Sequence, residues 1–374
     1  MPRTQTIIRP SFPTDYQSIL QRVYAINPVR YGRTRNYLDG AVSYLSPYIT
    51  HGVLTLPQVR DMVLENYSVQ QATDFIFQLT WREFFYRVWW QLGDDIWQDI
   101  KDPQQDIRTY EAPTAILDAN TGIYALDEAV RVLYETGYMH NHARMWIASV
   151  ACNVCGAYWK LPSQWLYYHL LDGDIASNTL SWQWVAGTFA SKKYFANQAN
   201  LNKYSGIEQH NTFLDVSYDE LRSATIELPR ELRLVTHLAL QTPLPPPKPI
   251  SIDTTKPLYL YHAWSLSPTW KANEDAERVL VLEPSHFQRY PISEKRVQFI
   301  LALAKNIPNL KIFVGEYHQL PNLDKASQVV FQAHPAVNHW RGYATGPVWL
   351  FPQLPQKMYG SFFSYWKKAQ RYLR

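Results

Sequence analysis

A proline-rich stretch divides the sequence into two parts that have different hydrophobic patterns. Residues 242–257 read TPLPPPKPISIDTTKP and hold six prolines. Proline fixes φ and has no N–H to donate, so such a stretch favours a stiff, extended chain over a helix or a sheet. We therefore expect two domains, residues 1–225 and 258–374, joined by a linker at 226–257.

Residues before the linker have the periodicity of helices. From 73 to 92, apolar side chains recur in a wide stripe that fits one face of a helix. Residues 126–132 and 139–157 behave similarly, and the alternation that is typical of strands is scarce. The first domain is therefore predicted to be all-helical.

Residues after the linker alternate between strand-like and helix-like segments. The strand-like runs, which are short and rich in β-branched and aromatic residues, are 258–264, 278–284, 311–317, 328–334 and 348–353. Helical stretches fall at about 292–306 and 361–373. This alternation predicts a small α/β domain with a largely parallel sheet. The expected fold class is thus a multi-domain chain, α followed by α/β.

The composition is typical of a globular protein. Of 374 residues, 46% are hydrophobic, and the net charge of +4 permits a polyanionic partner without requiring one. The N-terminal MPRTQTIIRPSF lacks the apolar stretch of a signal peptide, and no window reaches the roughly 18 apolar residues of a membrane span. Two cysteines are too few for a secreted disulfide framework. We expect a soluble, cytoplasmic protein with no membrane partner.

Aromatic residues are the unusual part of the composition. They make up 15% of the chain, including 14 Trp and 26 Tyr. Most such residues pack in cores, but an excess of this size also favours a planar ligand.

The densest polar cluster in an apolar region is HNHARM (140–145) followed by DGDIASNTLSWQW (172–184). Asp172 and Asp174 could bind a metal or a ligand, and Asp174 also suits the N-cap of the next helix. No further acid or histidine nearby completes a metal-ligand set, so no metal is expected. Arg144 is the natural partner for Asp172 because a buried carboxylate needs a charged donor.

The run GYMHNHARM…LLDGDIASNTLSWQW resembles the FAD-binding region of DNA photolyases and cryptochromes. FQLTWREFFYR (77–87) and RYGRTRNYLDGAVSYLSPYITHG (30–52) resemble two further motifs of that family, and all three follow the family's order within residues 20–205. The resemblance implies a helical FAD-binding domain, followed here by a Rossmann-like α/β domain.

The resemblance also implies the residues that hold FAD. These are Tyr31, Val42, Ser43, Tyr44, Leu45, Ser46, Arg82, Asn141, Arg144, Asp172, Asp174 and Asn178. Asp172 and Arg144 would pair beside the isoalloxazine, and Asp174 would bind its pyrimidine edge. Asn178 would face N5, where an amide has no acidic proton to give.

In the family, a tryptophan chain carries electrons to the flavin. Trp182 and Trp159 match the two inner members of this chain. The outer member is missing near Asp106, where Tyr110 or Trp97 would substitute.

The resemblance further implies a pocket for a flipped-out pyrimidine dimer. The predicted substrate contacts are Arg35, Gln78, Trp81, Asn141, His142, Met145 and Trp184. Trp81, Trp184, Asn141 and Met145 match the photolyases that repair cyclobutane dimers. Gln78 instead matches (6-4) photolyases and animal cryptochromes, and a neutral amide binds a base edge but delivers no proton. His142, with Arg35 and Lys192–Lys193, would contact phosphates.

These implications favour a blue-light DNA photolyase that repairs dimers by electron transfer from reduced FAD. Gln78 is predicted to be one of its catalytic residues. The alternative is a cryptochrome-type photoreceptor that acts through a signalling partner. Photolyases carry their α/β domain before the helical one, whereas this chain shows the reverse order. A circular permutation is the simplest interpretation.

An antenna pigment, a folate or a deazaflavin, belongs to the family, but no residue cluster here supports one. Cys152 and Cys155 exclude a four-cysteine iron–sulfur cluster, and we expect them to pack in the core.

Overall fold

The computed structural model describes residues 7–190, 192–223 and 226–373, so MPRTQT and residue 225, the predicted domain end, lie outside it. The chain forms two compact units whose segments alternate along the sequence. Unit 1 comprises the described parts of residues 1–11, 29–42 and 92–240, and unit 2 those of 12–28, 43–91 and 241–374. Each unit is described by itself.

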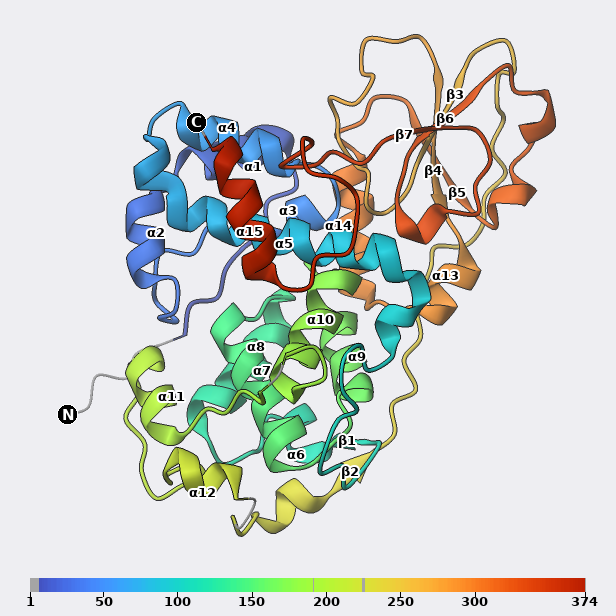
Figure 1. Ribbon diagram of the computed structural model, residues 1–374. Helices are drawn as coiled ribbons and strands as arrows, with labels where there is room; N and C mark the ends of the chain where they lie inside the picture. Colours follow the sequence, from blue (N-terminus) through green and yellow to red (C-terminus); the bar gives the residue numbers. More distant parts are fainter. Residues whose placement is uncertain (1–6, 191, 224–225, 374) are drawn as a thin grey trace. The chain divides into compact units, whose positions relative to one another are not determined.

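Unit 1 is built from helices. Its helices are α2 (Pro28–Thr34, whose first residue belongs to unit 2), α6 (Thr114–Leu117), α7 (Tyr124–Thr136), α8 (Asn141–Ser149), α9 (Lys160–His169), α10 (Ile175–Ala186), α11 (Gln198–Ser205) and α12 (Tyr218–Arg222). α8 continues into a π-turn at Val150–Val154, and α10 packs against both α8 and α9 (Figure 1). α7 and α10 both end at a left-handed glycine, a common helix terminator.

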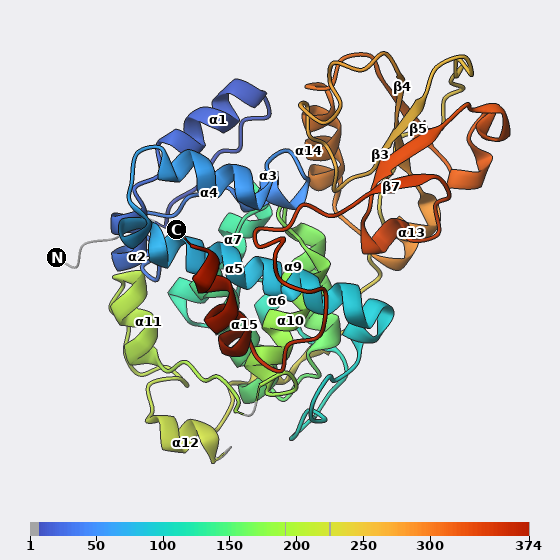
Figure 2. The ribbon, with the colours of Figure 1, turned by 45° about the horizontal axis from the view of Figure 1, so that its top comes forward.

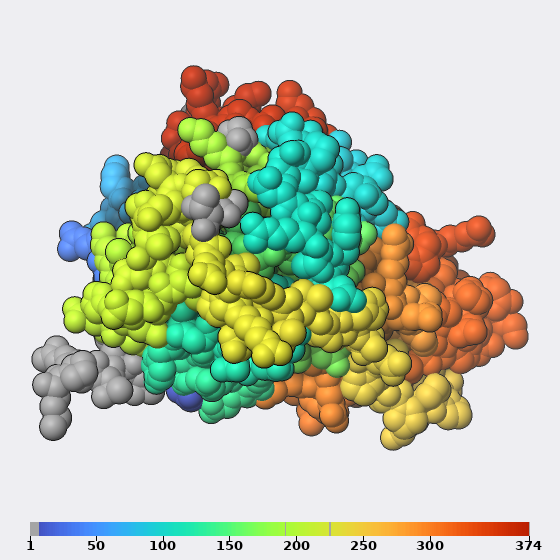
Figure 3. Space-filling view, turned by 90° about the horizontal axis from the view of Figure 1, so that it is seen from below, coloured from blue at the N-terminus to red at the C-terminus, as the bar shows by residue number. Residues whose placement is uncertain are grey.

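The first part of the predicted linker belongs to unit 1. Arg230–Arg233 form a 3₁₀ turn, and β2 (Val235–Thr236) pairs antiparallel with β1 (Ala112–Pro113). Figure 3 shows this yellow segment on the surface of the unit. Residues 241–253 form neither helix nor strand, as their prolines predict. The domain boundaries 1–225, 226–257 and 258–374 stay a prediction.

Unit 2 contains a five-stranded sheet in which every pair of neighbouring strands is parallel. The strands lie in the order β5-β4-β3-β6-β7, and their bounds are β3 (Leu258–Tyr261), β4 (Glu277–Leu282), β5 (Leu310–Val314), β6 (Val329–Gln332) and β7 (Tyr343–Thr345). α13 (Pro284–Arg289) and α14 (Glu294–Ala304) follow β4 in the chain (Figure 2). The α and α/β fold class is confirmed, with the sheet domain after the helical one.

The strand predicted at 348–353 is wrong. The last strand is β7, and residues 348–353 form no strand. Pro347 directly precedes this segment, and Pro352 interrupts it. The N–H groups of Leu350 and Phe351 donate to the carboxylate of Glu83 and not to a neighbouring strand. A buried side-chain acceptor thus replaces the sheet partner.

Helices from distant parts of the sequence complete unit 2. They are α1 (Tyr16–Tyr24), α3 (Ser46–Thr50), α4 (Leu56–Leu64), α5 (Val69–Leu92, whose last residue belongs to unit 1) and α15 (Phe362–Ala369). α15 lies alongside α5 in both ribbon views. In the described residues, no helix has the length and apolar character needed to span a membrane.

Candidate functional site

The predicted site residues divide between the two units. Unit 1 holds Tyr31, Arg35, Val42, Asn141, His142, Arg144, Met145, Trp159, Asp172, Asp174, Asn178, Trp182 and Trp184; unit 2 holds Ser43, Tyr44, Leu45, Ser46, Gln78, Trp81 and Arg82. Each group is described within its own unit.

An ion pair lies at the centre of the unit 1 group. Nη2 of Arg144, on α8, donates to both carboxylate oxygens of Asp172 at 2.9 Å. Its Nε donates to the carbonyl oxygen of Met139 at 2.8 Å. The Asp172 side chain is 4% exposed and that of Arg144 is 20% exposed. The pair therefore combines a buried anion with a cation that remains partly open to solvent.

Asp174 and Asn178 lie on the first turns of α10. Asp174 accepts a hydrogen bond from the N–H of Ser177 at 2.7 Å, so it caps the helix, one of the alternatives that its sequence position allows. Nδ2 of Asn178 donates to the carbonyl oxygen of Ser163 at 2.9 Å. This contact fixes the plane of the Asn178 amide and uses one of its two N–H groups.

His140, which the motif comparison did not single out, adds a buried donor to this group. Its Nδ1 accepts from the N–H of His142 at 3.1 Å, so Nε2 carries the proton. Burial, more than the nearby charges, lowers the pKa of His140 to about 3, which keeps the ring neutral. Among the described residues, no hydrogen bond of normal geometry reaches the buried Nε2, although the backbone of Arg35 interacts with the ring. Such a donor suits an acceptor on a ligand.

The aromatic residues predicted to carry electrons are buried in unit 1. Trp182 and Trp159 are both buried, and Nε1 of Trp159 donates to Asp99 at 2.6 Å. The ring of Tyr158 lies 5.7 Å from that of Trp159, and Tyr110 lies 5.4 Å from Tyr158.

Two residues were alternatives for the outer end of that path. Tyr110 is 69% exposed. Trp97 stacks on Trp159, with ring centroids 6.3 Å apart, but is itself buried. Tyr110 therefore reaches the surface and Trp97 does not.

The predicted substrate contacts of unit 1 are less uniform. Asn141 is exposed at the start of α8, and Arg35, Met145 and Trp184 are half-buried. The ring of Trp184 contacts that of Tyr194, with ring centroids 5.6 Å apart. Asn141, Met145 and Trp184 thus keep surface that a ligand can reach, and their roles stay predictions.

His142 does not suit the phosphate contact predicted for it. Its Nδ1 donates to the carbonyl oxygen of Asn36 at 2.8 Å, and its ring packs between Trp146 and Tyr204. Burial lowers the pKa of His142, so the ring stays uncharged. His142 therefore packs internally, and its phosphate contact stays a prediction.

The backbone of unit 2 at Tyr44 and Leu45 supports the predicted phosphate-binding stretch. Tyr44 has φ of 53°, in the left-handed region, and Leu45 is right-handed at φ −89° and ψ −14°. Adjacent residues of opposite hand turn successive N–H groups toward one side, which is the geometry of an anion-binding nest. Ser43 and Ser46 flank this turn, and α3 begins at Ser46. Nearby, Nη2 of Arg82 donates to Oγ1 of Thr50 at 2.7 Å.

One face of Trp81 is already covered within unit 2. Phe362 of α15 stacks on it with ring centroids 3.6 Å apart and planes at 8°. Trp81 is half-buried, as is Gln78 three residues earlier on α5. Phe85 also contacts Trp81, with ring centroids 5.3 Å apart, so only part of the Trp81 ring is exposed. No signal in the 77–87 motif points to Phe362, which lies far away in the sequence.

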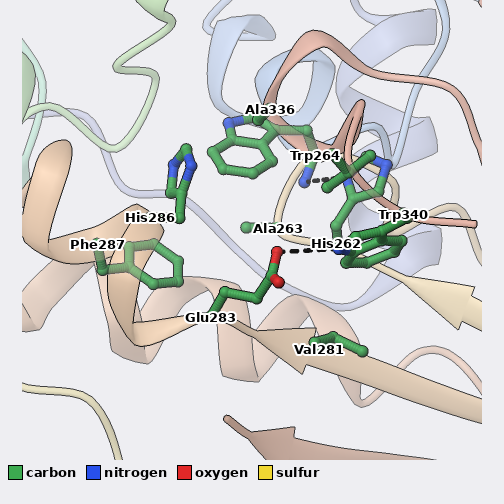
Figure 4. Close-up of a pocket in the computed structure, with 10 residues that line it drawn as sticks. His262, Ala263, Trp264, Val281, Glu283, His286, Phe287, Ala336 and Trp340 are labelled. Atoms are coloured by element: carbon green, nitrogen blue, oxygen red, sulfur yellow. Dashed lines mark hydrogen bonds between the residues drawn. The ribbon is translucent and has the colours of Figure 1, made fainter. Parts of the chain in front are cut away.

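A small cavity lies at the carboxyl ends of β3 and β4 in the sheet domain. Figure 4 shows His262, Trp264, Glu283, His286 and Trp340 around it. Glu283 is already engaged, because it accepts hydrogen bonds from His339 and Trp340. The space holds about one water molecule. A folate or deazaflavin ring does not fit there, and no step is assigned to an antenna.

No group of three or more His, Cys, Asp or Glu that could hold a metal occurs in the part of the chain that the structure describes. Cys152 and Cys155 are buried, and burial raises the pKa of Cys155 to about 12. Both thiols are therefore protonated at neutral pH.

Residues 75–223 match the FAD binding domain of DNA photolyase. A deoxyribodipyrimidine photo-lyase from Streptomyces griseus is 33% identical over 166 residues, which cover 42% of this chain and 36% of that protein. This chain is therefore similar, over its residues 75–223, to the FAD-binding domain of photolyases. The predicted FAD-binding domain is confirmed by the same match.

Cryptochromes also match this chain. A cryptochrome DASH from Danio rerio is 30% identical over 169 residues, or 42% of this chain and 32% of that protein. A class III photolyase structure from Agrobacterium tumefaciens has a TM-score of 0.46 at 22% identity, covering 60% of this chain and 53% of that one. The chain spans between about a third and a half of the length of the curated relatives that it matches.

Proposed function

We propose that this protein is a FAD-dependent, blue-light-driven photolyase that splits pyrimidine dimers in DNA. The observation that carries the proposal is the Arg144–Asp172 ion pair, with its buried carboxylate, together with the buried Nε2–H of His140, within a segment that matches a FAD-binding domain. Bound in its reduced form, FAD supplies the electron that splits the dimer.

The unit 1 residues fit the polar edge of a flavin chemically. That edge alternates hydrogen-bond donors and acceptors, and Asp172, Asp174 and Nε2–H of His140 offer both kinds of group. The positive charge of Arg144 stabilises negative charge that develops near Asp172. The amide of Asn178 carries no acidic proton, so it favours keeping the bound cofactor unprotonated.

For the substrate, Trp184 would pack on a base in unit 1. In unit 2, Trp81 would offer a base the part of its ring that Phe362 leaves uncovered. Gln78 would hydrogen-bond a thymine edge without donating a full proton. The exposed amide of Asn141 and the side chain of Met145 would complete the contacts. Arg35 would contact a phosphate. These roles, and a cytoplasmic location, belong to the proposal.

A repair assay tests the proposal directly. Purified protein is loaded with FAD, reduced and illuminated with single- and double-stranded DNA that carries cyclobutane dimers, and restored thymine is measured against a dark control. Light-dependent restoration supports the proposal, and no turnover on either substrate refutes it. Trp184→Ala should abolish most of the turnover, whereas Tyr343→Ala, an exposed aromatic on the sheet domain, should leave it unchanged.

A cryptochrome-type photoreceptor is the second candidate, and two observations favour it. His142 is buried, which weakens one predicted phosphate contact, and Phe362 covers one face of Trp81. Its signalling partner would be a protein. Light-induced change of the FAD absorption without any dimer repair would support this candidate over the first. Asn178→Asp should then alter that light-induced spectrum, since it places an acid beside the cofactor.

A further inference from the structure

Charge is unevenly distributed along this chain. After Asp324 the sequence contains no acidic residue but seven lysines and arginines, whereas the first 324 residues have 29 basic against 32 acidic residues. Residues 1–324 therefore have a net charge of −3, and residues 325–374 have a net charge of +7. The mild overall charge of +4 conceals a strongly basic C-terminal part.

The apolar side of α15 anchors this basic segment to α5. Phe362 stacks on Trp81, and the ring of Trp366 lies 5.0 Å from Phe77 in an edge contact. The hydroxyl of Tyr365 donates to Glu83, whose carboxylate is fully buried. These contacts fix which side of α15 faces outward.

The outward side of α15 is basic and aromatic. Lys367, Lys368 and Arg371 are exposed, and within the described residues none of the three forms a salt bridge. Phe363, four residues before Lys367, is 68% exposed, although its ring also lies 6.5 Å from that of Phe77. An exposed aromatic ring next to cations combines the two kinds of group with which proteins bind single-stranded nucleic acids.

We propose that the outward face of α15 binds single-stranded DNA. Lys367, Lys368 and Arg371 fit phosphates, and the exposed ring of Phe363 fits the face of an unpaired base. A duplex offers phosphates but no free base faces, so Phe363 selects a single strand or an opened site. DNA as the ligand rests on the proposed function, because α5 beneath α15 also carries Gln78 and Trp81, two predicted dimer contacts.

Binding in the dark tests this inference separately from repair. The probe is an undamaged, fluorescent oligothymidylate of about 20 nucleotides, titrated with the full chain at several salt concentrations. Replacing Lys367, Lys368 and Arg371 together by Gln should weaken binding at least tenfold. It should also reduce the slope of log affinity against log salt by about 2, since each phosphate contact contributes about 0.7.

Phe363→Ala tests the stacking contact. It should weaken oligothymidylate binding at least fivefold without changing the salt slope, because stacking releases no counterions. Tyr343→Ala is the matched control, since Tyr343 is 63% exposed on the sheet domain. Lys305, Lys325 and Arg341, which are also exposed, provide the control triple replacement by Gln.

The outcomes separate this inference from its alternatives. An unchanged salt slope in the α15 triple variant, or an equal loss in the control triple, overturns it. Binding of phosphatidylglycerol vesicles but not of oligothymidylate overturns it in favour of a membrane surface. A protein that binds oligothymidylate through α15 but repairs no dimer leaves this inference standing while the photolyase function fails.

Discussion

Each unit contains a buried carboxylate–arginine pair, and the two pairs are built differently. In unit 2, Glu83 and Arg87 are one helical turn apart on α5 and are 0% and 1% exposed. Arg87 also donates to the carbonyl oxygens of Phe351 and Leu354. Both charged groups of this pair thus have hydrogen-bond partners within the chain itself.

The unit 1 pair is more open. Arg144 is 20% exposed, and His140, four residues before it, keeps a buried Nε2–H that no hydrogen bond of normal geometry reaches in the described residues. A buried pair that is fully satisfied holds a fold together, whereas one with an unsatisfied neighbour is typical of a ligand site. On this comparison we propose a structural role for the unit 2 pair and a cofactor-binding role for the unit 1 pair.

The largest expected loss of stability comes from breaking the fully buried pair of unit 2, Glu83 and Arg87. Glu83→Gln leaves Arg87 charged, buried and without its anion, and should lower the free energy of unfolding by about 3–5 kcal/mol. Urea denaturation measures it. The exposed pair Asp219–Arg222 supplies the control, because Asp219→Asn should cost less than about 1 kcal/mol. A cost for Glu83→Gln as small as that of the control would contradict a structural role.

Breaking the partly exposed pair of unit 1, Arg144 and Asp172, should cost less stability but should also release the cofactor. Asp172→Asn removes a charge-assisted hydrogen bond and should cost about 1.5–3 kcal/mol of unfolding free energy, since Arg144 still reaches solvent. FAD retained after gel filtration should fall at least tenfold. Asp127→Asn, at a buried acid that binds Thr121, is the control. Asp127→Asn should lower stability without lowering FAD retention. Equal FAD retention in Asp127→Asn and Asp172→Asn would contradict a cofactor-binding role for Asp172.

The histidine beside the open pair gives a pH dependence. The folded pKa of His140 is about 3, below the 6.5 of an ordinary histidine, so the unfolded chain binds the extra proton first. This contribution to stability is complete above pH 6.5 and is lost as the pH falls. Between pH 6.5 and pH 5 the loss is about 1.5 kcal/mol.

His140→Asn isolates that contribution, because asparagine still accepts at the N-cap but does not titrate. The variant should lose less stability between pH 6.5 and pH 5 than the wild type, by about 1.5 kcal/mol. Identical pH profiles would show that His140 is not buried and neutral. His262 is not altered in the variant and accounts for part of the remaining slope, since burial lowers its pKa to about 4.

The sequence predicted local chemistry better than distant contacts. The helical periodicity before residue 220 and the parallel α/β pattern after 257 depend on neighbours within a few residues, and both fold classes are found. Asp172 with Arg144 was predictable because a buried carboxylate needs a charged donor and an arginine stands in the same motif.

Contacts between segments far apart in the sequence were not predictable. The strand expected at 348–353 is absent because Glu83, on a helix far earlier in the chain, takes its N–H groups. For the same reason Phe362 was missed as the neighbour of Trp81, and the burial of His142 depends on Tyr204 and Asn36. No local pattern encodes such pairings.

The smallest effect expected concerns the outer electron donor in unit 1. Tyr158 lies between buried Trp159 and exposed Tyr110, and its hydroxyl donates to Asp99 at 3.0 Å. Burial raises the pKa of Tyr158 to about 12, so the phenol is protonated until it is oxidised and then has a carboxylate at hand for its proton.

Tyr110→Phe should therefore slow light-driven reduction of bound FAD several-fold, because phenylalanine is much harder to oxidise. Trp97→Phe serves as the control and should change the rate little, since Trp97 is buried and has no surface from which to be re-reduced. The measurement is the absorbance of FAD under constant illumination with an external thiol reductant. A larger loss of rate in Trp97→Phe than in Tyr110→Phe would make Trp97 the outer electron donor. Stacking on Trp159 would then matter more than reaching the surface.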